Sequence, residues 1–331
     1  MTYQPNVYRE QGGDKMIVAN GGELELQSGA TLDVQAGCSF DCNGTFKLHG
    51  LEIPSGFANV YYVDGQNGDD DNDGLTMATA KKTYAAARTL SNATIDWGAT
   101  PKRYNAIFVA PGVYTEVCLP PYYCWVFGMG ILGTDTAAEF HPAAGSAITN
   151  PDLSGSTMLG TALVNLRFEC ETAVPVCNFG IFNNSILAGC EIVRGIAGLA
   201  TMGAEFDNVT HAQIIGNRFI SGVADHPIGL SFNGGADKFL HASRIEGNHI
   251  FASSKGITIA ANCTASGTII KDNVIVRPTK GIEDLSGLTF CINNWISALT
   301  DAIEHANSAT RCIGNHVINN ATGAVEASGT D

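Results

Sequence analysis

Hydrophobic positions recur from about residue 163 to residue 325 at a spacing that predicts a coil of short strands. The repeat is anchored by five asparagines, Asn217, Asn248, Asn273, Asn294 and Asn315, and Leu166 and Cys190 stand in two degenerate earlier copies. Successive anchors are 24, 27, 31, 25, 21 and 21 residues apart. Apolar residues stand three positions before every anchor, at Leu163, Leu187, Ile214, Ile245, Ile270, Cys291 and Cys312, and two positions after it, at Phe168, Ile192, Phe219, Ile250, Ile275, Ile296 and Val317. These positions indicate two inward-facing strands in each repeat.

A third inward position follows nine residues after five of the anchors. It is occupied by Leu199, Ile257, Ile282, Ile303 and Ala324. Three short strands in a period of 21 to 31 residues are typical of a solenoid, in which each turn stacks on the next. The anchor asparagines are expected to adopt the left-handed conformation at a bend and to form a structural ladder of bonded side chains.

Residues 1–57 have a different pattern and are expected to form a separate segment. Glycines punctuate four alternating stretches at 23–26, 31–34, 39–42 and 45–48, each with its second and fourth residues apolar. This period of two predicts half-buried strands. Strands this short are marginal alone, so the segment is expected to pack against other subunits or the next domain, although a plain β-meander is an alternative.

Residues 58–135 are expected to form the cap and first turn of the solenoid. A strand at 59–63 leads into an acidic loop at 64–74, and a helix is predicted over 78–92 with Thr76 or Thr79 as its N-cap. A further strand is predicted at 106–110. The chain therefore divides into an N-terminal segment at 1–57 and a β domain at 58–331.

Two stretches of sequence carry a resemblance to a known family. The repeats IIGNRFISG (214–222), IEGNHIFASSKGITI (245–259), IKDNVIVRPTKGI (270–282) and CIGNHVINNATGA (312–324) resemble the coils of right-handed parallel β-helix proteins of the pectate-lyase-like fold. The stretches at 61–87 and 106–116 resemble a cap and first turn common in tailed-phage particles, and the opening at 7–37 is similar to phage head-fibre and capsid-associated proteins. The resemblance implies an all-β, right-handed parallel β-helix with one capping helix, carried on a virion.

Composition narrows the range of partners. The 331 residues are 45% hydrophobic and carry a formal net charge of −14, so the surface is expected to repel nucleic acid and anionic lipid. The opening residues lack a signal peptide, and no apolar run is long enough for a membrane helix. These features predict synthesis in the host cytoplasm without a membrane or nucleic-acid partner.

The acidic loop is a candidate calcium site. Asp69, Asp71 and Asp73 have the alternating spacing that can direct oxygens at Ca²⁺, but Ala80 stands where an EF-hand needs a bidentate acid. An EF-hand is excluded, and a solvated acidic turn is the alternative.

Carboxylates of the coils are the candidates for polysaccharide cleavage, which needs two acids on neighbouring coils or a calcium-bound acid set with a basic residue. The acids of the repeats are Glu246, Asp272, Glu283, Asp284, Asp301 and Glu304, of which Glu283 and Glu304 align in successive coils. No groove of tryptophan or tyrosine accompanies them, so catalytic residues are not assigned. Arg167 and Arg218 follow their anchors directly and are expected to form salt bridges.

The chain has ten cysteines, at 38, 42, 118, 124, 170, 177, 190, 263, 291 and 312, in a pattern that does not indicate a zinc site. Most are expected to be small core hydrophobes. Cys38, Cys42, Cys118 and Cys124 lie outside the regular coils and are candidates for disulfides formed after the protein leaves the reducing cytosol. Cys291 and Cys312 are expected to stack as free thiols.

The resemblance to phage virion proteins, together with the absence of an assigned catalytic site, implies a non-enzymatic virion protein as the first functional hypothesis. It is expected to be a homotrimer on the particle surface, as a decoration, minor capsid or fibre protein that contacts the major capsid protein or neighbouring decoration proteins. The alternative is a small tailspike that binds or depolymerises a host surface polysaccharide. No cofactor is expected apart from calcium in the acidic loop.

Overall fold

The computed structural model describes residues 57–95, 104–134, 136–149, 158–195, 201–221, 226–234, 238–286, 289–305 and 310–318, and four short strands before residue 55. The contacts within the chain divide it into two units, Met1–Ser55 and Gly56–Asp331. This division lies two residues from the boundary that the sequence predicts after residue 57.

The first unit contains two antiparallel strand pairs. Strand β1 (Val7–Arg9) pairs with β2 (Met16–Val18), and β3 (Phe46–Leu48) pairs with β4 (Leu51–Ile53). Strand β3 falls within the stretch predicted at 45–48, whereas the predicted strands at 23–26, 31–34 and 39–42 lie outside the described residues, as do Cys38 and Cys42.

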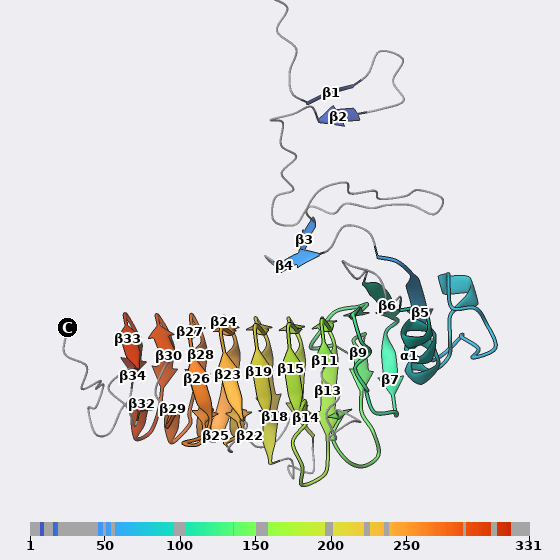
Figure 1. Ribbon diagram of the computed structural model, residues 1–331. Helices are drawn as coiled ribbons and strands as arrows, with labels where there is room; N and C mark the ends of the chain where they lie inside the picture. The colour runs from blue at the N-terminus through green and yellow to red at the C-terminus, as the bar shows by residue number, and fades with distance from the viewer. Residues whose placement is uncertain are drawn as a thin grey trace, which may run out of the picture. The chain divides into compact units, whose positions relative to one another are not determined.

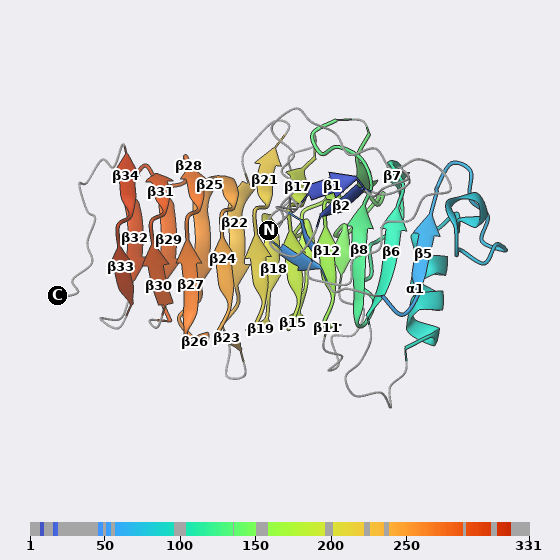
Figure 2. The same cartoon turned by 90° about the horizontal axis from the view of Figure 1, so that it is seen from above.

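The second unit is an all-β, right-handed parallel β-helix (Figures 1 and 2). Its chain visits four stacks of parallel strands in the regular coils up to β26 (Thr264–Ser266) and three stacks in the coils that follow. We name the stacks sheets I to IV in the order in which the chain meets them. Sheet I contains β5 (Val60–Val63), β6 (Asn105–Val109), β8 (Cys124–Gly128), β12 (Ala162–Val164), β16 (Ile186–Ala188), β20 (Gln213–Ile215), β24 (Arg244–Glu246), β27 (Thr268–Lys271), β30 (Thr289–Ile292) and β33 (Arg311–Ile313).

Sheets II and III share the long strand β25 (His249–Ile259), whose first part belongs to sheet II and whose last part belongs to sheet III. Sheet II also contains β7 (Gly112–Tyr114), β9 (Ala138–Phe140), β13 (Arg167–Cys170), β17 (Glu191–Arg194), β21 (Arg218–Ser221), β28 (Val274–Val276), β31 (Trp295–Ser297) and β34 (His316–Ile318). Sheet III adds β10 (Ile148–Thr149), β14 (Cys177–Asn178), β18 (Met202–Phe206), β22 (His226–Phe232), β29 (Lys280–Asp284) and β32 (Asp301–His305). Sheet IV contains β11 (Met158–Leu159), β15 (Ile181–Asn183), β19 (Asn208–Thr210), β23 (Phe239–His241) and β26 (Thr264–Ser266).

Two inward columns predicted from the sequence are confirmed. The residues three before each anchor pair directly from coil to coil in sheet I, and the residues two after each anchor do so in sheet II. These side chains are fully or almost fully buried, except at the last described coil, where Cys312 and Val317 are partly buried. Cys291 and Cys312 are register partners and are not joined by a disulfide.

The third inward column differs in the middle coils. Ile257, Ile282 and Ile303 pair in register as predicted, but the column continues upward through Leu230 and Ala204 rather than Leu199. Leu199 and Ala324 lie outside the described residues. The connections after β17 and β21 are longer than those of the later coils. In these coils the inward residue of sheet III therefore lies more than nine residues after the anchor, and the prediction based on a constant spacing is wrong.

The five anchor asparagines form a continuous ladder inside the turn between sheets I and II. In each step the backbone amide and the side-chain Nδ2 of one asparagine both donate to Oδ1 of the next, at 2.9–3.1 Å. Nδ2 also donates to a sheet I carbonyl, as Asn273 does to Ile245 at 2.9 Å. The Cys190 backbone amide ends the ladder on Oδ1 of Asn217. The hydrogen bonds of each buried anchor, from both its backbone amide and its side-chain amide, are therefore made with neighbouring coils.

The left-handed conformation belongs to the residue before each anchor rather than to the anchor itself, which corrects the sequence expectation. These preceding residues all have positive φ: Asn165, Gly189, Gly216, Gly247, Asp272, Asn293 and Gly314. The preceding residue reverses the chain at the surface, so that the anchor side chain points inward and can bond to its neighbours. Asparagine is needed at the anchor for its amide, not for its tolerance of positive φ.

A second polar column, not anticipated from the sequence, lies five residues before each anchor. Six of its seven positions carry a hydroxyl, Thr161, Ser185, Ser243, Thr268, Thr289 and Thr310, and the seventh is Ala212; all are buried. Several of its hydroxyls accept backbone amides from the preceding coil, such as Ala212 N to Ser243 Oγ at 3.1 Å, or donate to a nearby carbonyl. At the other end, Thr289 and Thr310 donate to the buried carboxylate of Asp284 at 2.7 and 2.8 Å. Short hydroxyl side chains thus form hydrogen bonds with buried backbone groups of the turn that leads into sheet I.

Helix α1 (Tyr84–Ala93) packs beside β5 and β6 at one end of the coils (Figure 1). It begins six residues later than predicted, and its N-cap is Thr83 instead of Thr76 or Thr79. Thr76 caps a separate 3₁₀ turn, η1 (Met77–Thr79). Lys81 lies between the two elements and pairs with Val63 as an extra strand-like bridge, which keeps this stretch extended.

Replacement of Asn273 by alanine is expected to destabilise the coils by roughly 2–4 kcal/mol, because the buried amides of Asn248 lose their acceptor. Replacement of the exposed Asn293, which precedes the anchor of the next coil, by glycine is the matched control, since φ there is +52° and glycine accepts that conformation. Urea unfolding followed by circular dichroism measures both. Equal loss of stability in the two variants would contradict the assigned ladder.

Candidate functional site

Charged side chains form an alternating column on the outer surface of sheet II. Glu139, Arg167, Glu191, Arg218 and His249 are direct register partners on five successive strands, β9, β13, β17, β21 and β25. Parallel neighbours lie about 4.8 Å apart, so side chains at equal register come into contact. Acids and bases therefore alternate along this part of the sheet.

Glu191 is the most enclosed member of this column. Its side chain is fully buried, and its Oε1 is 2.9 Å from Arg218 Nη1, while Arg167 Nη1 approaches Oε2 to 3.9 Å. Oε2 also accepts the backbone amide of Gly133 at 3.1 Å. Gly133 belongs to the connection between β8 and β9 and has φ of +78°. This connection therefore reaches across the sheet and covers Glu191. Its backbone amide supplies a hydrogen-bond donor to the buried carboxylate, whose lone pairs cannot be satisfied by water.

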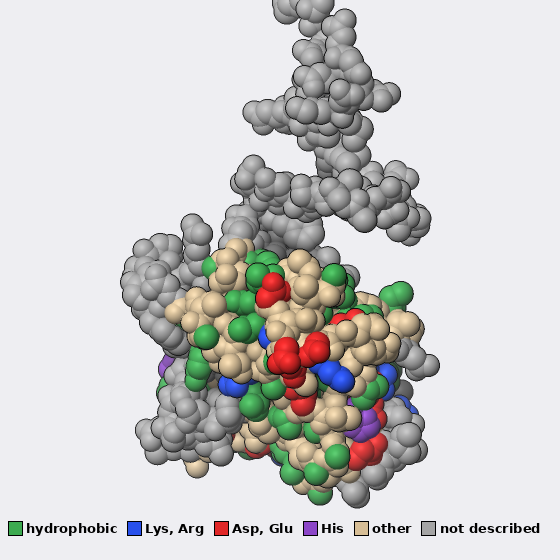
Figure 3. Space-filling view, turned by 90° about the vertical axis from the view of Figure 1, so that its right-hand side faces the viewer, with side chains coloured by type: hydrophobic (Ala, Val, Ile, Leu, Met, Phe, Trp, Pro, Cys, Tyr) green, Lys and Arg blue, Asp and Glu red, His purple; other side chains and the backbone are tan. Residues whose placement is uncertain are grey.

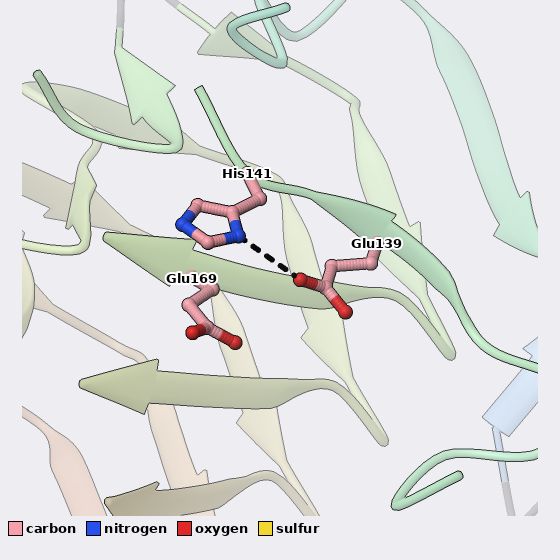
Figure 4. A group of neighbouring side chains, drawn as sticks. All are labelled: Glu139, His141 and Glu169. Carbon is pink, nitrogen blue, oxygen red and sulfur yellow. Dashed lines mark ion pairs between the residues drawn. The ribbon is translucent and has the colours of Figure 1, made fainter. Parts of the chain in front are cut away.

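A second group of polar side chains lies beside the column, two residues further along the strands. His141 Nδ1 is 3.3 Å from Glu139 Oε1 (Figure 4). Arg167 Nη2 is 2.8 Å from Glu169 Oε2. Arg167 Nε lies 3.3 Å from Glu139 Oε2. Burial raises the pKa of Glu139, and the charge of Glu169 raises it further, while Arg167 and His141 oppose this change. The site thus concentrates acids with limited access to water.

The chemistry available to Glu139, His141 and Glu169 is cation binding or proton transfer. One ligand atom from each residue lies within 4.8 Å of the other two, and among the described residues no other set of three His, Cys, Asp or Glu side chains converges in this way. A carboxyl group with a raised pKa beside a second carboxylate is also the pairing used by glycoside-cleaving enzymes. Both uses are considered below.

The pair predicted from the sequence, Glu283 and Glu304, is observed in register on β29 and β32. Lysines neutralise it: Lys255 and Lys280 both contact Glu283, and Lys280 also contacts Glu304. Burial acts to raise the pKa of Glu283, but bonds from the two lysines and Thr258 outweigh it, and the net shift is downward. The same contacts raise the pKa of Lys280. This arrangement is a network of ion pairs with no group suited to donate a proton at neutral pH.

The remaining acids of the coils are dispersed. Glu246 contacts Arg244 and, at 2.7 Å, Lys271, while Asp272 lies 3.6 Å from the same lysine. Asp284 is buried among hydroxyl groups. Asp301 begins β32 as the register partner of Lys280.

The salt bridges expected for Arg167 and Arg218 are present, and both converge on Glu191.

The acidic loop directs its carboxylates at its own backbone. Asp69 accepts the amide of Asp71, and Asp73 accepts the amide of Leu75 at 3.0 Å and the hydroxyl of Thr79 at 2.6 Å. Asp70, which the sequence did not single out, accepts the amides of Lys82 and Thr83 ahead of α1. Figure 3 shows the end of the molecule nearest α1, with acidic side chains gathered beside basic ones. Calcium binding by Asp69, Asp71 and Asp73 stays a prediction.

Cys118 and Cys124 are free, buried thiols in the structure. No disulfide joins these two candidate cysteines in the structure, and a disulfide formed after the protein leaves the reducing cytosol stays a prediction. Burial raises the pKa of both thiols, that of Cys124 to about 12, and they pack beside the buried face of α1 that carries Tyr84 and Ser91. Their place in the core makes them the small hydrophobes that the sequence suggests for the other cysteines.

Sequence reasoning missed Glu139, His141 and Glu169. The available signals were short: Glu-Phe-His at 139–141 and Arg-Phe-Glu-Cys-Glu at 167–171, in which alternate residues share one face of a strand. The first stretch lies before the regular repeat, where no anchor gave its register against the second.

Comparisons with known proteins concern the fold. No family model and no curated protein matches the chain. One similar solved structure is described as the complex structure of XylC with xylose, at 9% identity and a TM-score of 0.34, covering 74% of this chain and 69% of that one. Another is a rhamnogalacturonan lyase, at 12% identity and a TM-score of 0.40, covering 72% and 74%. The function of this chain must be argued from its own residues.

The described helices include none with the length and apolar content that crossing a bilayer requires.

A buried histidine predicts loss of stability in acid. His226 is fully buried with Nε2 3.2 Å from the carbonyl oxygen of Ile192, and desolvation lowers its pKa to about 4. The unfolded chain, with an ordinary histidine, binds its proton near pH 6.5, so stability from this group is complete above that pH and falls between pH 6.5 and 4.

Replacement of His226 by glutamine is expected to remove up to about 3 kcal/mol of the pH dependence of unfolding across this range. Replacement of the exposed His316 by glutamine is the control. Urea unfolding at several pH values checks the result, and an unchanged pH slope in the His226 variant would refute this assignment.

Proposed function

We propose that this protein is a non-enzymatic structural component of a tailed-phage particle, displayed on the virion surface as a decoration, minor capsid or fibre protein. Residues 1–57 attach it to the particle through the major capsid protein or neighbouring decoration proteins, and the β-helix is the displayed part. The observation that carries the proposal is the separation of Met1–Ser55 from the β-helix by its own contacts. The separated unit contains the opening stretch that resembles phage head-fibre proteins.

The ion pairs of the coils support a structural function. Glu191, Glu246 and Glu283 each contact two cationic side chains. Such paired carboxylates hold neighbouring coils together and are poor proton donors or nucleophiles. A durable displayed surface needs this arrangement more than a reactive groove.

The outer face of sheet I supports contacts with further copies. One outward column of this sheet is largely apolar and consists of Tyr62, Phe108, Phe127, Val164, Ala188, Ile215, Glu246, Lys271, Ile292 and Ile313. Phe108 stacks on Tyr62 and Phe127 with ring centroids 5.7 and 5.0 Å apart. Phe127, Val164 and Ala188 are buried, whereas Ile313 is 57% exposed and the other apolar members are partly exposed. The homotrimer in our proposal would use this face.

Deletion of residues 1–55 is expected to leave a folded β-helix that no longer joins the particle. Particles formed with the deleted or the full-length chain are purified, and the copy number is measured by quantitative gel electrophoresis. The control is the full-length chain carrying Asn293→Gly, which alters only an exposed turn of the β-helix. Recovery of the deleted chain at the normal copy number would refute attachment through this segment.

A second candidate function is binding or cleavage of a host surface polysaccharide. The observation that favours it is the neighbouring pair Glu139 and Glu169, in which burial raises the pKa of Glu139. A protonated and an ionised carboxyl group side by side is the minimum arrangement for acid-assisted glycoside cleavage. Arg167 bridges the two groups and opposes this use by stabilising both negative charges.

One experiment separates the two functions. Purified protein is incubated with polysaccharide from the host surface, and new reducing or unsaturated ends are measured; we expect none. Ends that appear with the wild type and with Glu246→Gln, but not with Glu139→Gln or Glu169→Gln, would support the second function and reject the first as a complete account.

A further inference from the structure

We propose that Glu139, His141 and Glu169 form a binding site for a divalent transition-metal ion such as Zn²⁺. This inference does not rest on the attachment function, because it concerns the β-helix alone.

The strand register brings the three ligands to one place. Glu139 and His141 are two residues apart at β9 and share its outer face, and Glu169 occupies the equivalent position to His141 on β13, because Arg167 pairs with Glu139 and Phe168 with Phe140. Their ligand atoms lie within 4.8 Å of one another (Figure 4). Side chains on adjacent paired strands are held more firmly than those on loops, so little rearrangement is needed to bind an ion.

Arg167 arranges the two carboxylates around the site. Its guanidinium group contacts Oε2 of Glu139 at 3.3 Å and Oε2 of Glu169 at 2.8 Å. The Oε1 atom of Glu139 instead lies 3.3 Å from His141 Nδ1. Arg167 therefore contacts Oε2 of both Glu139 and Glu169. The Oε1 atom of each acid is left as a metal ligand, together with a ring nitrogen of His141.

Glu171 completes the arrangement from the far side of the imidazole. Its Oε1 is 4.0 Å from His141 Nε2, so His141 has a carboxylate near each ring nitrogen. A histidine that binds a metal through one nitrogen commonly donates its other N–H to a carboxylate, which fixes the tautomer and strengthens the ligand. This observation is independent of the convergence of Glu139, His141 and Glu169.

The charge balance also favours a divalent cation. Four carboxylates, those of Glu139, Glu169, Glu171 and Glu191, face two guanidinium groups, those of Arg167 and Arg218. At the ligands themselves, the carboxylates of Glu139 and Glu169 share one guanidinium group, that of Arg167, so their negative charge is only partly balanced by it. One nitrogen and two oxygen ligands suit zinc or a similar first-row metal better than calcium or magnesium, and three protein ligands leave a position for water.

The test is isothermal titration calorimetry, in which ZnCl₂ is added to the full-length protein after EDTA treatment and dialysis. We expect one saturable site, its loss in His141→Ala, and affinity about 10- to 100-fold weaker in Glu171→Gln. His249→Ala is the matched control, because His249 lies on the outer face of the same sheet, and it should bind as the wild type does. Glu246→Gln controls for removal of an ion-paired acid elsewhere.

A thermal melt with EDTA shows whether each variant folds, and Zn²⁺ should raise the melting temperature of the wild type but not of His141→Ala. If His141→Ala fails to fold, the milder Glu171→Gln variant decides the question. No saturable binding by the wild type, or equal binding by His141→Ala or Glu171→Gln, would overturn the proposal and leave the cluster as an ion-pair network only. Particle attachment is measured separately, so failure of either proposal is recognised without the other.

Discussion

The buried turn between sheets I and II is the constraint on which the rest of the β-helix depends. The residue before each anchor reverses the chain at the surface, but the anchor itself lies in the interior, where water cannot reach its backbone amide. Asparagine solves this by letting one oxygen accept two amide donors of the neighbouring coil. Since the amide of each coil is satisfied only by the next one, coils must stack at one fixed register. That register then determines every other column, including the apolar columns of the core and the charge column of sheet II.

Much of this architecture was accessible from the sequence because it is periodic. The residues three before and two after each anchor were predicted correctly, since the short turn between sheets I and II has a constant length. The conformation at the turn was predicted wrongly. Asparagine both tolerates positive φ and forms hydrogen bonds through its side-chain amide, and the sequence alone does not tell which property a position uses. The glycine, Asn293 or Asp272 before each anchor carries the first property, and the anchor carries the second. The third column failed where the connections change length, as at Leu230, and α1 began late because Lys81 is committed to pairing with Val63.

The candidate site was harder to predict for a physical reason. Its residues come from β9 and β13, at the edge of the regular repeat, where no anchor precedes Glu139. Its function depends on which acids share a guanidinium group and which do not, and that follows from three-dimensional contacts rather than spacing. Glu283 and Glu304 were easier to notice because they align, yet the lysines between them make them structural. Alignment of like residues in a solenoid therefore indicates contact, while the partners on the flanking positions decide the chemistry.

The ladder also has a consequence for how such a chain can change its length. Each anchor asparagine bonds to equivalent atoms above and below it, so the coil between Asn273 and Asn294 presents the same upper and lower edges as its neighbours. A duplication or loss of that 21-residue unit would rejoin one asparagine to another and leave the ladder unbroken. Other steps of the same ladder span 31 and 25 residues, so a coil also accepts extra residues in its connections as long as an asparagine stands at the anchor. A β-helix of this kind can therefore be lengthened or shortened in whole steps of one strand spacing, about 4.8 Å, while its sides keep their pattern.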